Sequence, residues 1–305
     1  MTLDAQSSAA LMPYRALVDA LRTAAIGVSE GNIRCPQRQV LALPAGGSLL
    51  SMIAKGGDLA VHKLVTFIPA NPSRRIPAIQ GQVSVWSIDN GSHVLTLDGA
   101  TVTGRRTAAL SMLGVSELRP ARPKSFRIFG TGTQALHHVE AIAQLYPEAK
   151  IAVSGRSRRA AEDFCAARAG LSPLLSASHL RGCDEPDVVI TCTTSQDPVY
   201  EAPAREDCLV IATGSFTPAA AEIGAATVLA SRVYVDTLEG AREEAGDLIR
   251  AGVDWPGVRS LSQRLSGEGS ADSAVLFKTV GLAAWDLAAA RVAVKNLQAA
   301  GTSSA

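Results

Sequence analysis

The chain has 305 residues, of which 47% are hydrophobic and 19% are charged. This length allows two domains with sizeable cores, and the composition excludes disorder as the dominant state. Lysine and arginine number 29 against 28 acidic residues, which leaves a formal net charge of +1 at pH 7. Such a balance argues against a nucleic acid or an anionic membrane as the main partner, but it permits a small basic pocket for an anionic ligand.

The sequence carries no signal for a membrane span, a signal peptide or a disulfide framework. No stretch stays apolar over the roughly 20 residues that a transmembrane helix needs, and no basic segment followed by an apolar core opens the chain. The cysteines are odd in number, scattered and without a C-x-x-C pair: Cys35, Cys165, Cys183, Cys192 and Cys208. We therefore expect a protein of the reducing cytoplasm, with neither a disulfide nor a metal site.

The first third of the chain combines a helix with several strands. Leu17, Leu21 and Ala24 recur at helical spacing, which predicts an amphipathic helix over 14–29. Short apolar runs separated by turn residues predict strands at 39–43, 48–54, 60–67, 81–88 and 94–97. Asn90-Gly91, between the last two, is typical of a hairpin turn.

A second pattern, in which strands and helices alternate, begins near Pro120. Strands are predicted at 125–129, 151–154, 188–191, 208–212 and 232–235, and helices at 133–145 and 159–169. This alternation predicts an α/β fold with a doubly wound parallel sheet and helices on both of its faces. We expect the last helix, 279–297, to pack back on the first domain, which would then be built from both chain ends.

A glycine-rich turn follows the first of these strands. The run from Gly130 to Ala135 reads G-x-G-x-x-A and opens a predicted helix. Gly130 permits a tight turn, Gly132 lets the backbone approach a pyrophosphate, and Ala135 allows close packing of helix on strand. Because the strand, the turn, the helix and the next strand are all present, we predict a Rossmann-type dinucleotide site rather than a merely structural turn.

The end of the next strand indicates which dinucleotide binds. An NAD site usually has a carboxylate there for the ribose 2′-hydroxyl, but this chain has Arg156, Ser157 and Arg158. A guanidinium matches a phosphate bidentately, so these three residues predict a site for the 2′-phosphate of NADPH. The alternative is a basic helix start that only faces solvent.

Two cations lie at positions that are unfavourable for a positive charge. Lys63 falls on the same strand face as Val61 and Val65, which is costly unless the ammonium meets an anion or, as an edge lysine, reaches water. We expect Thr103 to cap a helix whose first turn contains Arg106, a position that suits a bound carboxylate. Arg38 is a third candidate cation. One carboxylate held by Lys63 and Arg106, with help from Arg38, would explain these placements.

The chain resembles the ornithine cyclodeaminase/μ-crystallin family over nearly its whole length. The matching stretches are HKLVTF, IPAIQGQV, LDGATVTGRRTAALS, IFGTGTQA and VLFKTVGLAAWDLAAA. The resemblance implies a substrate-binding and dimerisation domain over 1–118, completed by 284–305, and a dinucleotide-binding domain over 119–283. It also implies a homodimer.

The resemblance assigns roles to individual residues. It places Lys63, Arg106 and Arg38 at the substrate carboxylate. It places Thr193 and Ser195 in a loop that meets the cofactor, and Lys278 and Gly281 near the nicotinamide. The predicted cofactor contacts are therefore Gly130, Thr131, Gly132, Thr133, Gln134, Ala135, Arg156, Ser157, Arg158, Thr193, Ser195, Lys278 and Gly281.

One departure from the family separates its activities. The cyclodeaminases carry an acidic general base in a Gly-Ala-Asp-x-Pro-Gly segment, but Phe216 stands at that position here. Loss of ammonia needs a base, whereas reduction of a preformed cyclic imine needs chiefly a hydride and correct orientation. The variant resembles Δ1-pyrroline-2-carboxylate reductases, and Phe216 is predicted to pack on the ring.

The resemblance thus implies a ketimine reductase of proline metabolism. It would reduce Δ1-pyrroline-2-carboxylate, Δ1-piperideine-2-carboxylate or both to L-proline or L-pipecolate with NADPH, NADH being the other option. Two alternatives remain open: an ornithine cyclodeaminase with a base recruited from elsewhere, and a non-enzymatic NADPH-binding protein of the crystallin type.

Overall fold

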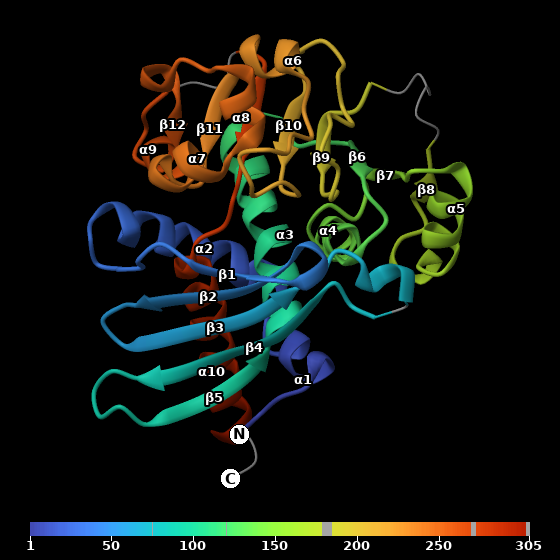
Figure 1. Ribbon diagram of the computed structural model, residues 1–305. Helices are drawn as coiled ribbons and strands as arrows, with labels where there is room; N and C mark the ends of the chain where they lie inside the picture. Colours follow the sequence, from blue (N-terminus) through green and yellow to red (C-terminus); the bar gives the residue numbers. More distant parts are fainter. Residues whose placement is uncertain (75, 120, 179–184, 270–272, 303–305) are drawn as a thin grey trace. The chain divides into compact units, whose positions relative to one another are not determined.

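The computed structural model describes residues 1–74, 76–119, 121–178, 185–269 and 273–302. They form two compact units, Met1–Ala109 with Leu282–Ala305 and Leu110–Gly281 (Figure 1). In the described part, no helix has the length and apolarity that a membrane crossing requires. Cys35, Cys165, Cys192 and Cys208 are free thiols, while Cys183 lies outside the described residues.

The first unit is an antiparallel sheet with helices. Its five strands follow one another in sequence order: β1 (Gln39–Leu43), β2 (Gly47–Lys55), β3 (Leu59–Phe67), β4 (Ile79–Ser87) and β5 (His93–Asp98). The helices are α1 (Ala5–Ala10), α2 (Tyr14–Ser29) and α10 (Ala283–Thr302). Helix α10 packs on β2, β3, β5 and α2, which confirms that the two chain ends build this unit together (Figure 1).

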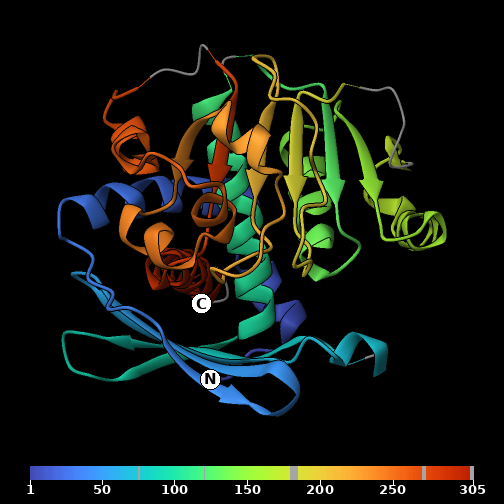
Figure 2. The same ribbon diagram turned by 45° about the horizontal axis from the view of Figure 1, so that its top comes forward.

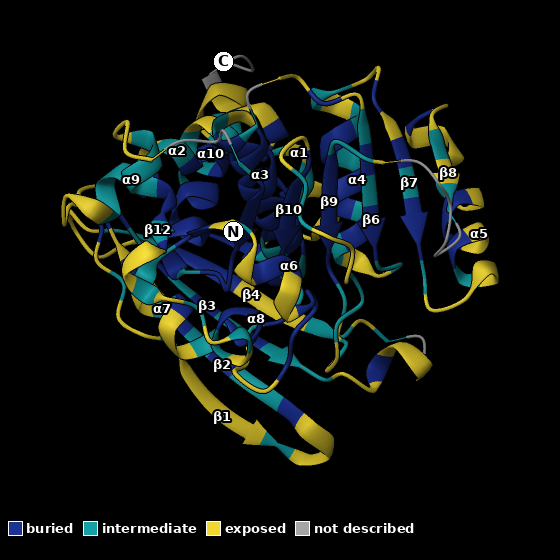
Figure 3. Cartoon of the chain, turned by 90° about the horizontal axis from the view of Figure 1, so that it is seen from above, coloured by how far each residue is buried: buried dark blue, intermediate teal, exposed yellow. Residues whose placement is uncertain are grey.

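Strand β1, at one edge of this sheet, is open to solvent. The first four residues of β1 are exposed, and Val40 and Leu41 are 58% and 62% exposed (Figure 3). An exposed apolar strand edge can pair with another chain. Strand β3, in the middle of the sheet, shows the predicted alternation instead, with Leu59, Val61, Lys63 and Val65 buried.

Two predicted helix starts are wrong. Helix α3 (Gly99–Leu118) begins before Thr103, because Asp98 accepts hydrogen bonds from the backbone N–H and the hydroxyl of Thr101 at 2.8 and 2.5 Å. Arg106 therefore lies in the second turn of α3. Helix α10 begins at Ala283 rather than at residue 279, because Gly281 has a φ of +87°, which a right-handed helix does not accommodate.

The second unit is the predicted doubly wound parallel sheet, visible as a row of aligned arrows in Figure 2. Its order is β12-β11-β13-β10-β9-β6-β7-β8. The strands are β6 (Ser125–Phe129), β7 (Lys150–Ser154), β8 (Leu175–Ala177), β9 (Val188–Thr191), β10 (Leu209–Ala212), β11 (Arg232–Val235), β12 (Arg259–Ser260) and β13 (Val275–Lys278). The sequence patterns did not predict β8, β12 or β13.

Helices cover both faces of this sheet, as predicted. Besides α3, they are α4 (Thr133–Leu145), α5 (Arg158–Ala166), α6 (Ala225–Leu229), α7 (Leu238–Glu244), α8 (Gly246–Ala251) and α9 (Leu261–Leu265). Leu276 packs in a core with residues of α6, α7 and α8, including Val228 and Leu248. The next residue of the strand, Phe277, points to the opposite face and meets Gly114 of α3.

The strand order reverses between β6 and β9. From β6 the chain winds outward through β7 and β8, and it then returns to β9 on the other side of β6. In open α/β sheets, ligands bind beyond the carboxyl ends of the strands at such a switch point. Gly130 follows β6 at this point and Thr193 lies just beyond β9, so the fold brings both predicted cofactor segments to one edge.

We predict that Gly114→Ala destabilises the protein. Alanine normally stabilises a helix relative to glycine by up to about 1 kcal/mol. Here, however, the added Cβ would lie 2.6 Å from Cδ1 of Phe277. Overpacking of this kind costs about 1–3 kcal/mol, so the sign should reverse in a denaturant titration. Gly301→Ala in α10, where a Cβ meets nothing within 4 Å, is the control and should not destabilise. An unchanged or raised stability of Gly114→Ala would contradict the packing.

Candidate active site

Two buried cations of the first unit share one carboxylate. Lys63 Nζ lies 2.7 Å from Oδ2 of Asp286, and Arg106 Nε lies 3.4 Å from Oδ1 of the same side chain. Lys63 is 2% exposed, Arg106 6% and Asp286 0%. Strand β3, helix α3 and helix α10 each supply one of the three groups. Lys63 is thus not an edge lysine that reaches water. The carboxylate that it shares with Arg106 belongs to the protein's own Asp286, and the substrate carboxylate at these cations stays a prediction.

The electrostatics of this cluster act mainly on Lys63. Burial lowers the pKa of Lys63 to about 8, against the attraction of Asp286. Repulsion from Arg106 and Arg38 lowers that pKa further. Arg38 is half-buried and precedes β1, so all three predicted cations act at one place. The ammonium is charged at neutral pH, and the two cations with Asp286 leave one positive charge for an anionic ligand.

The adjacent arginine, Arg105, makes different contacts. Arg105 Nε donates to the backbone oxygen of Met12 at 3.0 Å, and its guanidinium lies 4.0 Å from the ring centroid of Tyr14. This side chain therefore ties α3 to the start of α2. Its neighbour Arg106 instead contacts the buried carboxylate of Asp286.

The turn after β6 has the geometry of a phosphate site. Gly130 has a φ of +131°, and a Cβ there would lie 2.8 Å from the backbone oxygen of Cys192, so only glycine fits. At Gly132 an added Cβ meets nothing within 4 Å, which leaves the backbone open to a ligand. No side chain caps α4 at this end, and Ala135 is fully buried against the sheet. The uncapped N–H groups of Thr133 and Gln134 suit a pyrophosphate.

The basic segment after β7 is exposed. Ser157 caps α5 by accepting from the backbone N–H of Ala160 at 3.2 Å. Arg158 pairs with Glu162 at 2.6 Å on an exposed helix face, where such a pair stabilises little. Arg156 makes no ion pair within the described residues. The segment presents two guanidinium groups, and neither is committed to the protein core.

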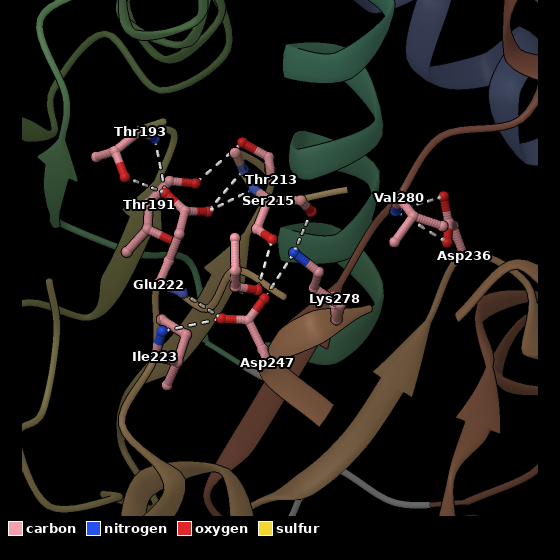
Figure 4. A network of polar contacts seen from close by, with 12 residues as sticks. Thr191, Thr193, Thr213, Ser215, Glu222, Ile223, Asp236, Asp247, Lys278 and Val280 are labelled. Carbon is pink, nitrogen blue, oxygen red and sulfur yellow. Dashed lines mark hydrogen bonds and ion pairs between the residues drawn. The ribbon is translucent and has the colours of Figure 1, made fainter. Parts of the chain in front are cut away.

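A buried carboxylate joins the loops that follow β9 and β10. Oε1 of Glu222 accepts from the backbone N–H and the hydroxyl of Thr193 at 2.6 and 2.9 Å (Figure 4). Oε2 accepts from the N–H groups of Gly214 and Ser215 at 2.6 and 3.2 Å. Burial raises the pKa of Glu222, and Lys278 and Thr193 oppose that rise. This carboxylate fixes the loop that continues into Phe216, which is half-buried.

Lys278 reaches the same loop from β13. Its ammonium donates to the backbone oxygen of Ser215 at 2.6 Å and lies 2.8 Å from Oδ2 of Asp247 (Figure 4). Asp247 in turn accepts from the backbone N–H groups of Glu222 and Ile223 at 2.5 and 2.9 Å. Lys278 is fully buried, and its ammonium contacts only groups of the protein in these interactions. Its side chain therefore holds the loop in place from the protein interior.

The turn that contains Gly281 is fixed by Asp236. This carboxylate accepts from the hydroxyl of Thr279 at 2.9 Å, from the N–H of Val280 at 3.2 Å and from the N–H of Gly281 at 2.8 Å. Figure 4 shows Asp236 directly against Val280. The side chain of Ser195 is also used locally, since it donates to the backbone oxygen of Asp197 at 2.7 Å.

Sequence reasoning missed three of the acids that organise these segments: Glu222, Asp247 and Asp286. Glu222 and Asp286 did leave a signal, because each is a single acidic residue within a run of small apolar residues, AAAEIGAA and AAWDLAAA. A lone charge in an otherwise buried segment requires a partner. The sequence does not reveal which partner that is.

Comparisons with known proteins show which proteins this chain resembles in sequence and in fold. A related protein of Azospirillum brasilense, named Delta(1)-pyrroline-2-carboxylate/Delta(1)-piperideine-2-carboxylate reductase, is 48% identical over 297 residues, covering 97% of this chain and 96% of its own. The structure of Thermococcus litoralis Delta(1)-pyrroline-2-carboxylate reductase, in complex with NADH and L-proline, has a TM-score of 0.89 at 22% identity and covers 99% of this chain and 98% of its own. An archaeal alanine dehydrogenase dimer with bound NAD has a TM-score of 0.86 at 23% identity and covers 99% and 97%.

A family sequence model matches nearly the whole chain. The sequence model of the ornithine cyclodeaminase/mu-crystallin family matches residues 3–301. This match spans the antiparallel sheet, the parallel sheet and the closing helix. The chain therefore belongs to the ornithine cyclodeaminase/mu-crystallin family.

Proposed function

We propose that this protein is a ketimine reductase that reduces Δ1-pyrroline-2-carboxylate, Δ1-piperideine-2-carboxylate or both to the cyclic L-amino acid. One observation carries the proposal. Lys63 and Arg106 are buried on a single carboxylate, in a chain 48% identical to a reductase named for these two imines. A buried pair of cations with one unit of positive charge to spare fits a ligand with one carboxylate.

The chain's own residues would bind and orient the imine. Arg106 and Lys63, assisted by Arg38, hold the substrate carboxylate, so that C2 of the ring has a fixed orientation. Positioning of a reactant can contribute several kcal/mol to catalysis. Phe216 would pack against the ring. A protonated imine accepts hydride more readily than a neutral one. The buried cations would oppose a positive charge on the ring, and the substrate carboxylate would offset that repulsion.

The dinucleotide fits the turn after β6. Gly130, Thr131, Gly132, Thr133, Gln134 and Ala135 would hold its pyrophosphate at the open backbone and the uncapped start of α4. Arg156, Ser157 and Arg158 would hold a 2′-phosphate, which makes NADPH the proposed cofactor. When bound, the cofactor supplies the hydride. Thr193, Ser195, Lys278 and Gly281 would act through the loop conformations that Glu222, Asp247 and Asp236 fix.

We also propose that the sequence-based domain division, 1–118 with 284–305 and 119–283, separates substrate binding from cofactor binding. The cytoplasmic location stays a prediction. A homodimer is proposed because β1 exposes an apolar edge and the archaeal relative is described as a dimer.

Arg106→Met should raise KM for Δ1-pyrroline-2-carboxylate about 10- to 100-fold, since a charge-assisted hydrogen bond contributes about 1.5–3 kcal/mol. The measurement is NADPH oxidation at varied imine concentration. The control is Arg291→Met in α10. It removes a solvent-exposed ion pair with Asp58 and should leave KM unchanged. Failure of the unmodified protein to oxidise NADPH or NADH with either cyclic imine would refute the proposed function.

Replacing both Arg156 and Arg158 with alanine should raise KM for NADPH about tenfold or more and leave KM for NADH unchanged, because only NADPH carries the 2′-phosphate. Arg159→Ala, one position further along and 91% exposed, is the matched control. If the double substitution changed both KM values equally, the result would show that these arginines do not bind the 2′-phosphate.

Leu41→Glu should convert the protein from dimer to monomer in light scattering, because it places a charge on the exposed edge of β1. Leu229→Glu in α6 is similarly exposed, at 59% against 62%, and should leave the dimer intact. A monomeric unmodified protein, or a dimer that persists in Leu41→Glu, would show that β1 is not the interface.

A further inference from the structure

Asp286 is buried where a substrate carboxylate is expected to bind. It lies at the start of α10, a segment with no exposed residue from Ala283 to Ala290. Its two oxygens face different cations, with Lys63 at 2.7 Å and Arg106 at 3.4 Å. A carboxylate removed from water is retained only if nearby charges stabilise it, so Asp286 and the two cations require one another.

The charges around Lys63 are otherwise positive. Arg106 approaches from α3 and Arg38 from the segment before β1, and both repel the ammonium. Among the described residues that act on this ammonium, Asp286 alone is negative. Without Asp286, burial and repulsion would act together to remove the proton from Lys63.

We propose, on the basis of the proposed function, that Asp286 is a positioning residue that keeps Lys63 charged and aimed, so that the site can bind a single carboxylate. Lys63 and Arg106 then remain in place before the substrate arrives. The site keeps a net positive charge, which the substrate carboxylate would offset. The other role that the contacts allow is a structural anchor that only ties α10 to β3 and α3.

The two roles separate in a double-mutant cycle with Lys63→Arg, Asp286→Asn and the combination. The measurement is kcat/KM for Δ1-pyrroline-2-carboxylate at pH values on both sides of the Lys63 pKa of about 8. The unmodified protein should lose kcat/KM as pH rises through that value, because the neutral amine does not bind a carboxylate. Any titration of the imine itself is common to all four proteins.

Asp286→Asn removes the attraction that raises the pKa of Lys63, so the loss should begin about one pH unit or more lower. A shift of one unit amounts to about fivefold lower kcat/KM at pH 8, about tenfold lower well above pH 8, and a much smaller change at lower pH. Arginine stays charged without help. In the Lys63→Arg background, Asp286→Asn should therefore cost much less and shift no alkaline limb.

An equal loss at every pH, or the same loss in both backgrounds, would overturn the proposal in favour of a structural anchor. Asp286→Glu keeps the charge and provides the second variant if Asp286→Asn does not fold. An alkaline limb that stays near pH 8 in Asp286→Glu supports the proposal, and a limb displaced to lower pH contradicts it.

Calorimetric binding of pyrrole-2-carboxylate, a flat monocarboxylate, across the same pH range tests the site without turnover. If the unmodified protein binds this anion with the expected pH dependence and Asp286→Asn moves that dependence to lower pH, but no imine is reduced, the proposed function fails and the role of Asp286 stands. If imine reduction is found and Asp286→Asn changes neither pH profile, the role of Asp286 fails and the function stands.

Discussion

The candidate substrate site depends on one buried carboxylate. Lys63 and Arg106 lie in a place from which water is excluded, and two like charges there would repel each other and favour loss of the lysine proton. Asp286 offsets both effects through direct contact with each cation. It neutralises only one of them, so positive charge remains for the anion that the proposed function requires. In that proposal, the same residue would account both for the stability of the buried cations and for the affinity of the site for a carboxylate.

The parallel-sheet unit uses buried charge in a different way. Strand ends leave backbone N–H groups without ladder partners, and these groups must be satisfied if the loops are to be buried. Glu222 and Asp247 accept them, and Lys278 compensates part of the resulting negative charge. Loops built in this way are fixed by several short contacts, which suits segments that must position a ligand to within fractions of an ångström.

The sequence predicts local structure here better than it predicts long-range contacts. Helix α2, the β4–β5 hairpin and the β6–α4 turn follow from periodicity and glycine placement, which neighbouring residues determine. The position of Lys63 on an apolar strand face also follows, because its strand alternates, but the sequence left open whether its ammonium is buried or reaches water. The partner of Lys63 does not, since Asp286 comes from the opposite end of the chain. Strand β13 was missed for a related reason: it is inserted between β10 and β11, and only its burial on both faces identifies it.

The buried acids also bear on whether the protein is a reductase or a lyase. A cyclodeaminase needs a general base, and Phe216 stands where the family's acid would lie. In the described part of the parallel-sheet unit, Glu222 and Asp247 are carboxylates of the polar network that holds the loop before Phe216. Both are fully buried, and their oxygens are contacted by N–H, O–H and ammonium donors. Asp286 is likewise engaged by two cations. These carboxylates are already engaged within the protein, so none of them is free to act as the base that loss of ammonia requires. Reduction of a preformed imine makes no such demand, and this difference favours the reductase.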